Sequence, residues 1–104
     1  MTQSPLAGAT AALRGAALTF VADPFLVPSR DALRHEPDAL VVVADGRIAA
    51  FGPAAEWLPA LPPAVPVTRY DDALIVPGFI DTHVHYPQLP IVAAYGRTLL
   101  DWLD

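Results

Sequence analysis

The clearest pattern of apolar and polar positions lies in the middle of the chain. Two β-like runs, Ala39–Ala44 (ALVVVA) and Arg47–Phe51 (RIAAF), flank the dipeptide Asp45-Gly46. Asp-Gly is favoured in two-residue hairpin turns, because both turn residues take positive φ. This pattern predicts a β-hairpin, and Gly52 with Pro53 predicts the end of its second strand.

The other elements follow from short apolar runs and from proline. We expect a strand over 16–22 and an edge strand over 65–70, where proline is tolerated. We also expect strands over 74–76 and 79–83, the latter followed by a loop. Further expectations are a loop over 28–38, one helical turn over 54–58, a turn at Asp71-Asp72 and the start of a helix over 99–103. Residues 1–15 are predicted to be a flexible leader, 16–76 a small, mostly β domain, and 77–104 the beginning of a different unit.

Composition limits the classes of function. The 104 residues are 54% apolar and 16% charged, against about 25% charged in a typical soluble domain. Apolar surface is therefore expected to be covered by something else. The net charge of −5 argues against a nucleic-acid partner. Without Cys there are no disulfides and no thiolate metal sites. No apolar run is long enough for a transmembrane helix, and the N-terminus is not typical of a signal peptide, so we expect no membrane association and a cytoplasmic location.

Candidate chemistry is concentrated in VPGFIDTHVHYPQ, residues 76–88. In a strand, His83 and His85 would point to one face, where two imidazoles can bind one metal ion. Zinc, iron, nickel and copper all accept such ligands. Asp81 would face the same side and could orient a ligand histidine by accepting its hydrogen bond.

Each residue also has an ordinary structural interpretation. A His-x-His pair arises often by chance, Asp81 alone is commonly a structural hydrogen-bond acceptor, and Gln88 alone is commonly a loop residue. His35, the third histidine, lies in the predicted loop over 28–38 and is expected to be a surface residue.

The motif VPGFIDTHVH resembles the amidohydrolase superfamily, whose first barrel strand carries Pro-Gly, two apolar residues and Asp-x-His-x-His. The hairpin DGRIAAFG resembles the same family. The implied fold class is mainly β: the N-terminal part of the composite β-sandwich, over 16–76, plus the first strand of an incomplete metal-dependent (β/α)8 TIM barrel, over 77–104.

The continuation, with Tyr86-Pro87-Gln88 and LLDWL at 99–103, looks like the guanine deaminase branch of that family. The resemblance implies hydrolytic deamination of guanine to xanthine and ammonia by an enzyme with one Zn²⁺. It implies that His83 and His85 are zinc ligands and that Gln88 contacts the base, with guanine and water as partners and a homodimer for the intact enzyme. It places no catalytic residue within this chain, because the proton shuttle and the other ligands come from later strands.

Two alternatives stay open. The chain could belong to another aminohydrolase of the superfamily, acting on a related heterocycle. It could also be a non-catalytic β domain that lacks the barrel. Because the chain ends soon after the first barrel strand, we expect an N-terminal fragment that binds zinc weakly and is inactive alone.

Overall fold

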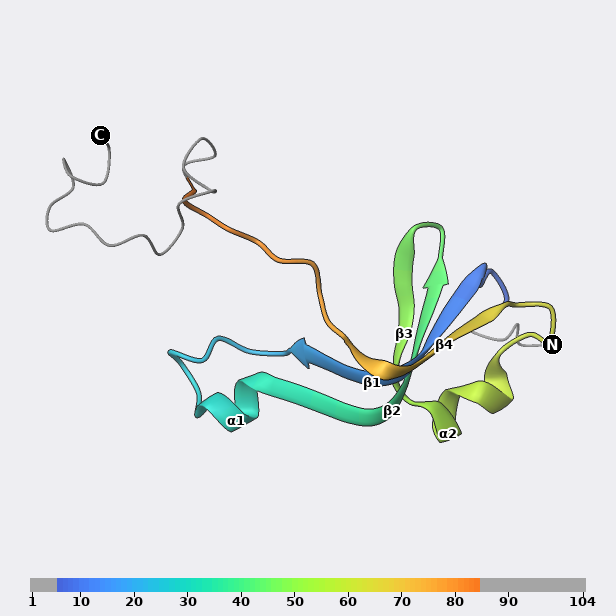
Figure 1. Ribbon diagram of the computed structural model, residues 1–104, viewed down its shortest axis with the longest axis horizontal. Coiled ribbons are helices and arrows are strands. Elements are labelled where there is room, and N and C mark those ends of the chain that lie inside the picture. Colours follow the sequence, from blue (N-terminus) through green and yellow to red (C-terminus); the bar gives the residue numbers. More distant parts are fainter. Residues whose placement is uncertain (1–5, 85–104) are drawn as a thin grey trace, which may run out of the picture.

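The computed structural model describes residues 6–84, which form one open four-stranded sheet with the strand order β3-β2-β1-β4 (Figure 1). The mainly β fold predicted from the sequence is confirmed. No helix among the described residues has the length and apolar character to cross a membrane. The strands are β1 (Ala11–Phe20), β2 (Leu33–Ala44), β3 (Arg47–Pro53) and β4 (Val67–Ile75), and the helices are α1 (Ser29–Ala32), α2 (Ala54–Trp57) and the 3₁₀ turn η1 (Leu58–Ala60).

The β2–β3 hairpin is confirmed, including its turn. Asp45 and Gly46 both have positive φ, 51° and 70°, as a type I′ turn requires. The strands are antiparallel, and Val42 faces Ala50 whereas Val43 faces Ile48. Ala49 is therefore an extra residue, and it forms a bulge close to the turn.

The long β1–β2 pair differs from the prediction. Residues 11–15, predicted to lie in the leader, belong to β1. The loop predicted over 28–38 is instead α1 over Ser29–Ala32 and, from Leu33, the first part of β2. The predicted loop failed because its polar side chains lie on an exposed strand that is paired along its length with β1. Its proline is accommodated by a bulge: Pro37 and Asp38 together face the single residue Ala16, where a missing N–H does no harm.

The predicted edge strand is confirmed as β4, which pairs in parallel with β1. Gly15 allows the close approach, because a Cβ there would lie 2.6 Å from the Tyr70 carbonyl oxygen. The predicted turn at Asp71-Asp72 is instead a bulge within one continuous strand. Gly15 faces Tyr70 and Ala16 faces Leu74, so residues 71–73 have no partner on β1.

The core lies between one face of the sheet and the segment α2–η1. Buried Ala12, Leu40, Val42 and Ala50 from three strands meet Leu6 and Ala54. The indole of Trp57 covers Gly52, where an added Cβ would lie 2.7 Å from its Nε1. Single turns this short are stabilised by such packing rather than by helix propensity.

The opposite face of the sheet carries apolar side chains over a hollow of about 100 Å³. Its lining comes from all four strands and from the segment after β4: Leu18, Thr19, Val41, Ile48, Phe51, Ile75, Val76 and Pro77. Ile48 is 69% exposed. The residues from 6 to 84 thus supply one sheet and one helical layer, and leave the second face open.

Candidate functional site

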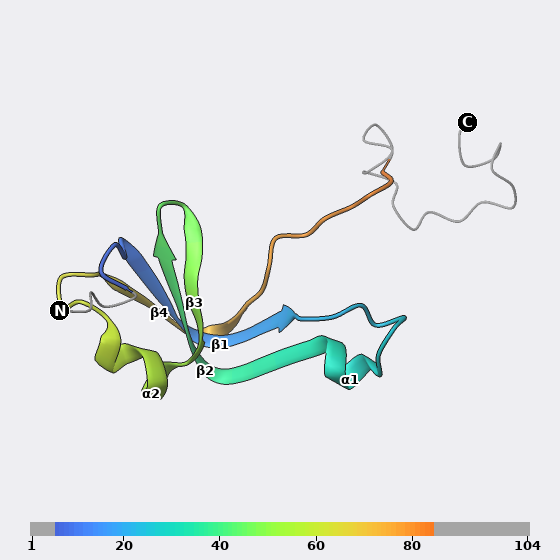
Figure 2. The same ribbon diagram turned by 180° about the vertical axis from the view of Figure 1, so that it is seen from behind.

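The segment that carries the predicted site leaves the sheet after Ile75. Residues 76–84 run away from the strands (orange in Figures 1 and 2) and contain no strand. The predicted strand over 79–83 is therefore wrong. A strand needs a hydrogen-bonded neighbour, and none of the described residues lies beside this segment in the sheet. Phe79 and Ile80 are 98% and 88% exposed.

Asp81 and His83 are brought together by a local turn. The Asp81 carboxylate oxygen Oδ1 accepts a hydrogen bond of 3.0 Å from the backbone N–H of His83, which is the two-residue pattern of an Asx-turn. Both residues are exposed. Asp81 thus fixes the backbone at His83 in this structure, and its predicted contact with a ligand imidazole stays a prediction.

The other predicted site residues, His85 and Gln88, lie outside the described residues, as does the predicted helix start over 99–103. Whether His83 and His85 share a face is accordingly untested. His35 lies on β2 and is exposed, as expected for a surface residue.

The side chains at the predicted site are of a type that binds metal ions, but too few of them lie within residues 6–84. Imidazole nitrogen is a good ligand for zinc, but a structural or catalytic zinc site takes three or four protein ligands. Within residues 6–84 no group of three or more His, Cys, Asp or Glu side chains could hold a metal. His83 is the one predicted ligand in this range, so the described part of the chain does not make a complete metal site.

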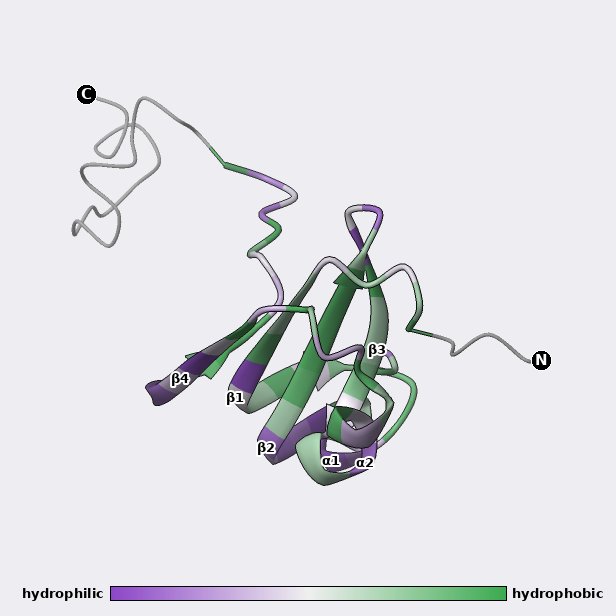
Figure 3. Ribbon diagram, turned by 90° about the vertical axis from the view of Figure 1, so that its right-hand side faces the viewer, coloured by the Kyte–Doolittle hydropathy of each residue, from purple (hydrophilic) through white to green (hydrophobic). Residues whose placement is uncertain are grey.

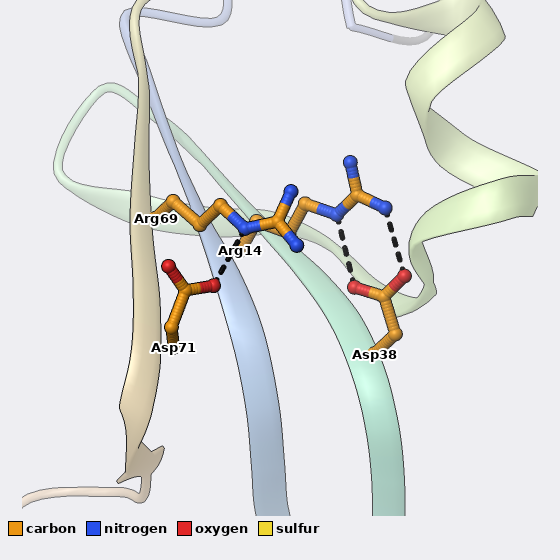
Figure 4. Close-up of polar contacts among 4 residues, drawn as sticks. All are labelled: Arg14, Asp38, Arg69 and Asp71. Carbon is orange, nitrogen blue, oxygen red and sulfur yellow. Dashed lines mark hydrogen bonds and ion pairs between the residues drawn. The ribbon is translucent and has the colours of Figure 1, made fainter.

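A second polar cluster, which the sequence did not predict, lies at the β2–β1–β4 side of the sheet (Figure 4). Arg14 on β1 donates two hydrogen bonds to Asp38 on β2, from Nε at 2.9 Å and from an Nη at 2.8 Å. Arg69 and Asp71 on β4 are joined at 2.7 Å. The only available signal was the i, i+2 spacing of Arg69 and Asp71, since Arg14 and Asp38 are 24 positions apart.

The Arg14–Asp38 pair shifts the titration of both groups. The hydrogen bond from Arg14, and then its charge, lowers the pKa of Asp38 below its usual value. The same bond from Asp38 raises the pKa of Arg14. Because the pair joins two strands across the bulge at Pro37, it favours the observed register rather than a reaction at this surface.

The chain is similar in both sequence and structure to proteins named guanine deaminase. Guanine deaminase of Escherichia coli is 44% identical over 73 residues, which are 70% of this chain and 17% of that protein. A solved structure titled E. coli guanine deaminase matches with a TM-score of 0.68 and 37% identity, over 90% of this chain and 22% of that one. Guanine deaminase from Bradyrhizobium japonicum matches with a TM-score of 0.64 and 43% identity, over 90% of this chain and 20% of that one.

The chain is also similar in sequence to a protein with a different name, an imidazolonepropionase. Imidazolonepropionase of Haloarcula marismortui is 35% identical over 74 residues, which are 66% of this chain and 18% of that protein. No family model matches the chain. The chain spans about a fifth of the length of the relatives and structures that it matches. Its sequence and its sheet are similar to a partial, N-terminal stretch of proteins named guanine deaminase.

Proposed function

We propose that this chain is the N-terminal part of a zinc-dependent guanine deaminase, a hydrolase of purine catabolism. The reaction combines guanine with water and gives xanthine and ammonia. The observation that carries the proposal is the agreement of sequence and fold with guanine deaminases over most of this chain. The motif at 76–88, on which the family resemblance in the sequence rests, supports it.

In this proposal His83 and His85 hold the metal, and Asp81 keeps the backbone at His83 in place through its 3.0 Å hydrogen bond. Zinc, when bound, supplies the acidity that makes water a nucleophile at neutral pH. Gln88 contacts guanine, since its amide offers one donor group and one acceptor to the edge of a purine. The remaining ligands and the proton shuttle are assigned to residues outside this chain.

The test uses the full protein encoded by the reading frame that contains this chain, with ammonia release from guanine and bound zinc as readouts. His83→Ala and His85→Ala should each lose zinc and activity. Gln88→Ala should keep zinc and lose on the order of tenfold in kcat/KM, because one buried hydrogen-bonding edge becomes unpaired. The matched control is His35→Ala, which removes an exposed histidine on β2 and should change neither readout.

Retention of zinc and full activity in His83→Ala would contradict the metal assignment. A protein that binds zinc but releases no ammonia from guanine would contradict the substrate. The isolated 104-residue chain should bind zinc weakly and release no ammonia, because two imidazoles fill only two of the four positions of a zinc ion.

The second candidate is a related hydrolase that acts on a different nitrogen heterocycle. The 35% identity to a protein named imidazolonepropionase favours keeping it, because this stretch is shared by proteins with different activities. An assay of the full protein against a panel of purines, pyrimidines and imidazolones separates the two candidates. The cytoplasmic location and the homodimer of the intact enzyme stay predictions.

A further inference from the structure

Strand β4 contains three residues more than the part of β1 with which it pairs. Residues 67–70 pair one for one with residues 12–15. Residues 74–75 pair with the next two residues of β1, 16–17. Residues 71–73 lie between these two sets as a bulge, so the nine residues of β4 advance along only six residues of β1.

The bulge determines where β4 ends. In the structure Ile75 lies opposite Ala17, and the segment over 76–84 leaves the sheet from there. If all nine residues were paired in sequence, Ile75 would lie opposite Phe20, three residues or about 10 Å further along β1. Because three is an odd number, the side chains of Leu74 and Ile75 would also exchange faces of the sheet.

Two carboxylates keep the bulge out of the continuous pairing. In the continuous register Asp72 would lie opposite Ala17, which is 1% exposed, whereas in the bulge both Asp71 and Asp72 are exposed. An ionised carboxylate beside a buried side chain costs free energy unless it is paired, and aspartate is also disfavoured in strands. In Figure 3, β4 accordingly carries a hydrophilic stretch, whereas the centre of β2 is hydrophobic.

Two contacts before the bulge hold it in place. Arg69 donates a hydrogen bond from Nε to Oδ1 of Asp71 at 2.7 Å, and Figure 4 shows both side chains directed over β1 towards Arg14. Gly15 provides space on β1, because an added Cβ there would lie 2.6 Å from the carbonyl oxygen of Tyr70, the last residue before the bulge. The bulge is therefore fixed by side chains on both strands.

We propose that Asp71 and Asp72 are positioning residues for the segment that carries His83. They act through the register of β4: their carboxylates exclude the continuous pairing, so the strand ends beside Ala17 and the segment leaves the sheet at one point and from one face. The inference rests on the proposed function, in which His83 holds the metal. Neither carboxylate contacts the metal or the substrate in this role.

The register can be measured in the 104-residue chain by nuclear Overhauser effects between backbone protons of β1 and β4. The wild-type chain should connect Ile75 with Ala17. Asp71→Val/Asp72→Val should connect Ile75 with Phe20 instead, because two β-branched apolar residues complete the continuous strand. Asp71→Asn/Asp72→Asn keeps polar side chains of the same size and should retain the wild-type connection.

The consequence for the site is measured in the full protein, as bound zinc and as ammonia release from guanine. The valine variant should lose zinc and on the order of a hundredfold or more in kcat, because a misplacement of about 1 Å can already cost that much. The asparagine variant should match the wild-type protein in both readouts. If the valine variant does not fold, Asp72→Val alone gives the same measurement, because Asp72 is the residue that would face Ala17.

Three results would overturn the positioning role. They are a folded valine variant that keeps the connection of Ile75 with Ala17, an asparagine variant that loses it, and a shifted register with unchanged zinc and activity. The last of these would leave the proposed function intact. A wild-type full protein that neither binds zinc nor releases ammonia would overturn the proposed function and the positioning role together, whatever the register of β4.

Discussion

The sheet and the segment that follows it show two different relations between sequence and structure. In the sheet, strands β1 to β4 pair with one another, and the hydrophobic pattern becomes strands with a packed face. In residues 76–84, the run VPGFI is equally apolar, yet it forms no strand and exposes Phe79 and Ile80. An apolar run therefore specifies a strand only where the fold supplies a neighbouring strand.

The largest effect is expected from alanine substitutions that compare the sheet with residues 76–84, measured as the free energy of unfolding in urea. Leu40 is fully buried on β2, so Leu40→Ala should lower the stability by about 2–5 kcal/mol through lost burial and a cavity. Ile80 is 88% exposed in the segment, so the matched change Ile80→Ala should cost less than about 0.5 kcal/mol.

An equal loss in Ile80→Ala would break the comparison, because it would show that the segment packs against the sheet. If Leu40→Ala does not fold, Val42→Ala gives the same measurement with a smaller deletion in the same buried cluster. A negligible effect of both core variants would contradict the core described for this sheet.

Short sequence motifs predicted correctly those elements whose conformation depends only on neighbouring residues. The turn at Asp45-Gly46 and the helical turn after Gly52-Pro53 are each decided within a few residues, and both were predicted. The strand over 33–38 was not predicted, because its sequence is polar. It is a strand because its backbone pairs with β1, which is distant in sequence. The bulge at Pro37 also could not be predicted, because it is defined only by the pairing of β2 with β1.

For the candidate site, the sequence predicted the chemical roles of the residues but not their arrangement in space. The types and spacing of His83 and His85 indicated metal ligands, and Asp81 was predicted to orient one of these histidines. The comparisons support the family from which the ligand role was inferred. Their geometry was not predictable, because it depends on strands that would have to lie beside 79–83. The hydrogen bond from the His83 backbone to Asp81 is a local turn, which the strand prediction had excluded.

An intermediate effect is expected from glycine, the residue type that both regions share. Gly46 has φ +70° in the hairpin turn, so Gly46→Ala should lower the free energy of unfolding by about 1–2 kcal/mol, the cost of a left-handed conformation. Gly78 in the segment has open space around its Cα and does not require positive φ.

Gly78→Ala is therefore the matched control, and it should not lower the stability, since a less flexible unfolded chain favours folding slightly. Thermal unfolding followed by circular dichroism compares the two variants. A larger loss for Gly78→Ala than for Gly46→Ala would mean that the segment, and not the turn, constrains the backbone.

The smallest effect concerns pH and tests whether the ion pair across the Pro37 bulge belongs to the stable region. The pKa of Asp38 is lower in the folded chain than its ordinary value of 3.8, so folding favours its charged form. Its contribution is present above the unfolded pKa and is lost as pH falls from about 3.8 through the folded value. Asp38 is exposed, so the contribution should be small and should shrink in high salt.

Asp38→Asn removes the charge and keeps the size of the side chain, so its urea midpoint should fall less steeply in acid than that of the wild-type chain. The two midpoints should converge at low pH, where Asp38 is protonated and the pair with Arg14 is lost. Parallel acid profiles would show that this pair adds nothing to the register of β1 and β2. The exposed half of β2 would then be held by its backbone ladder alone, and residues 33–38 would resemble the segment after Ile75 more closely than the buried half of their own strand.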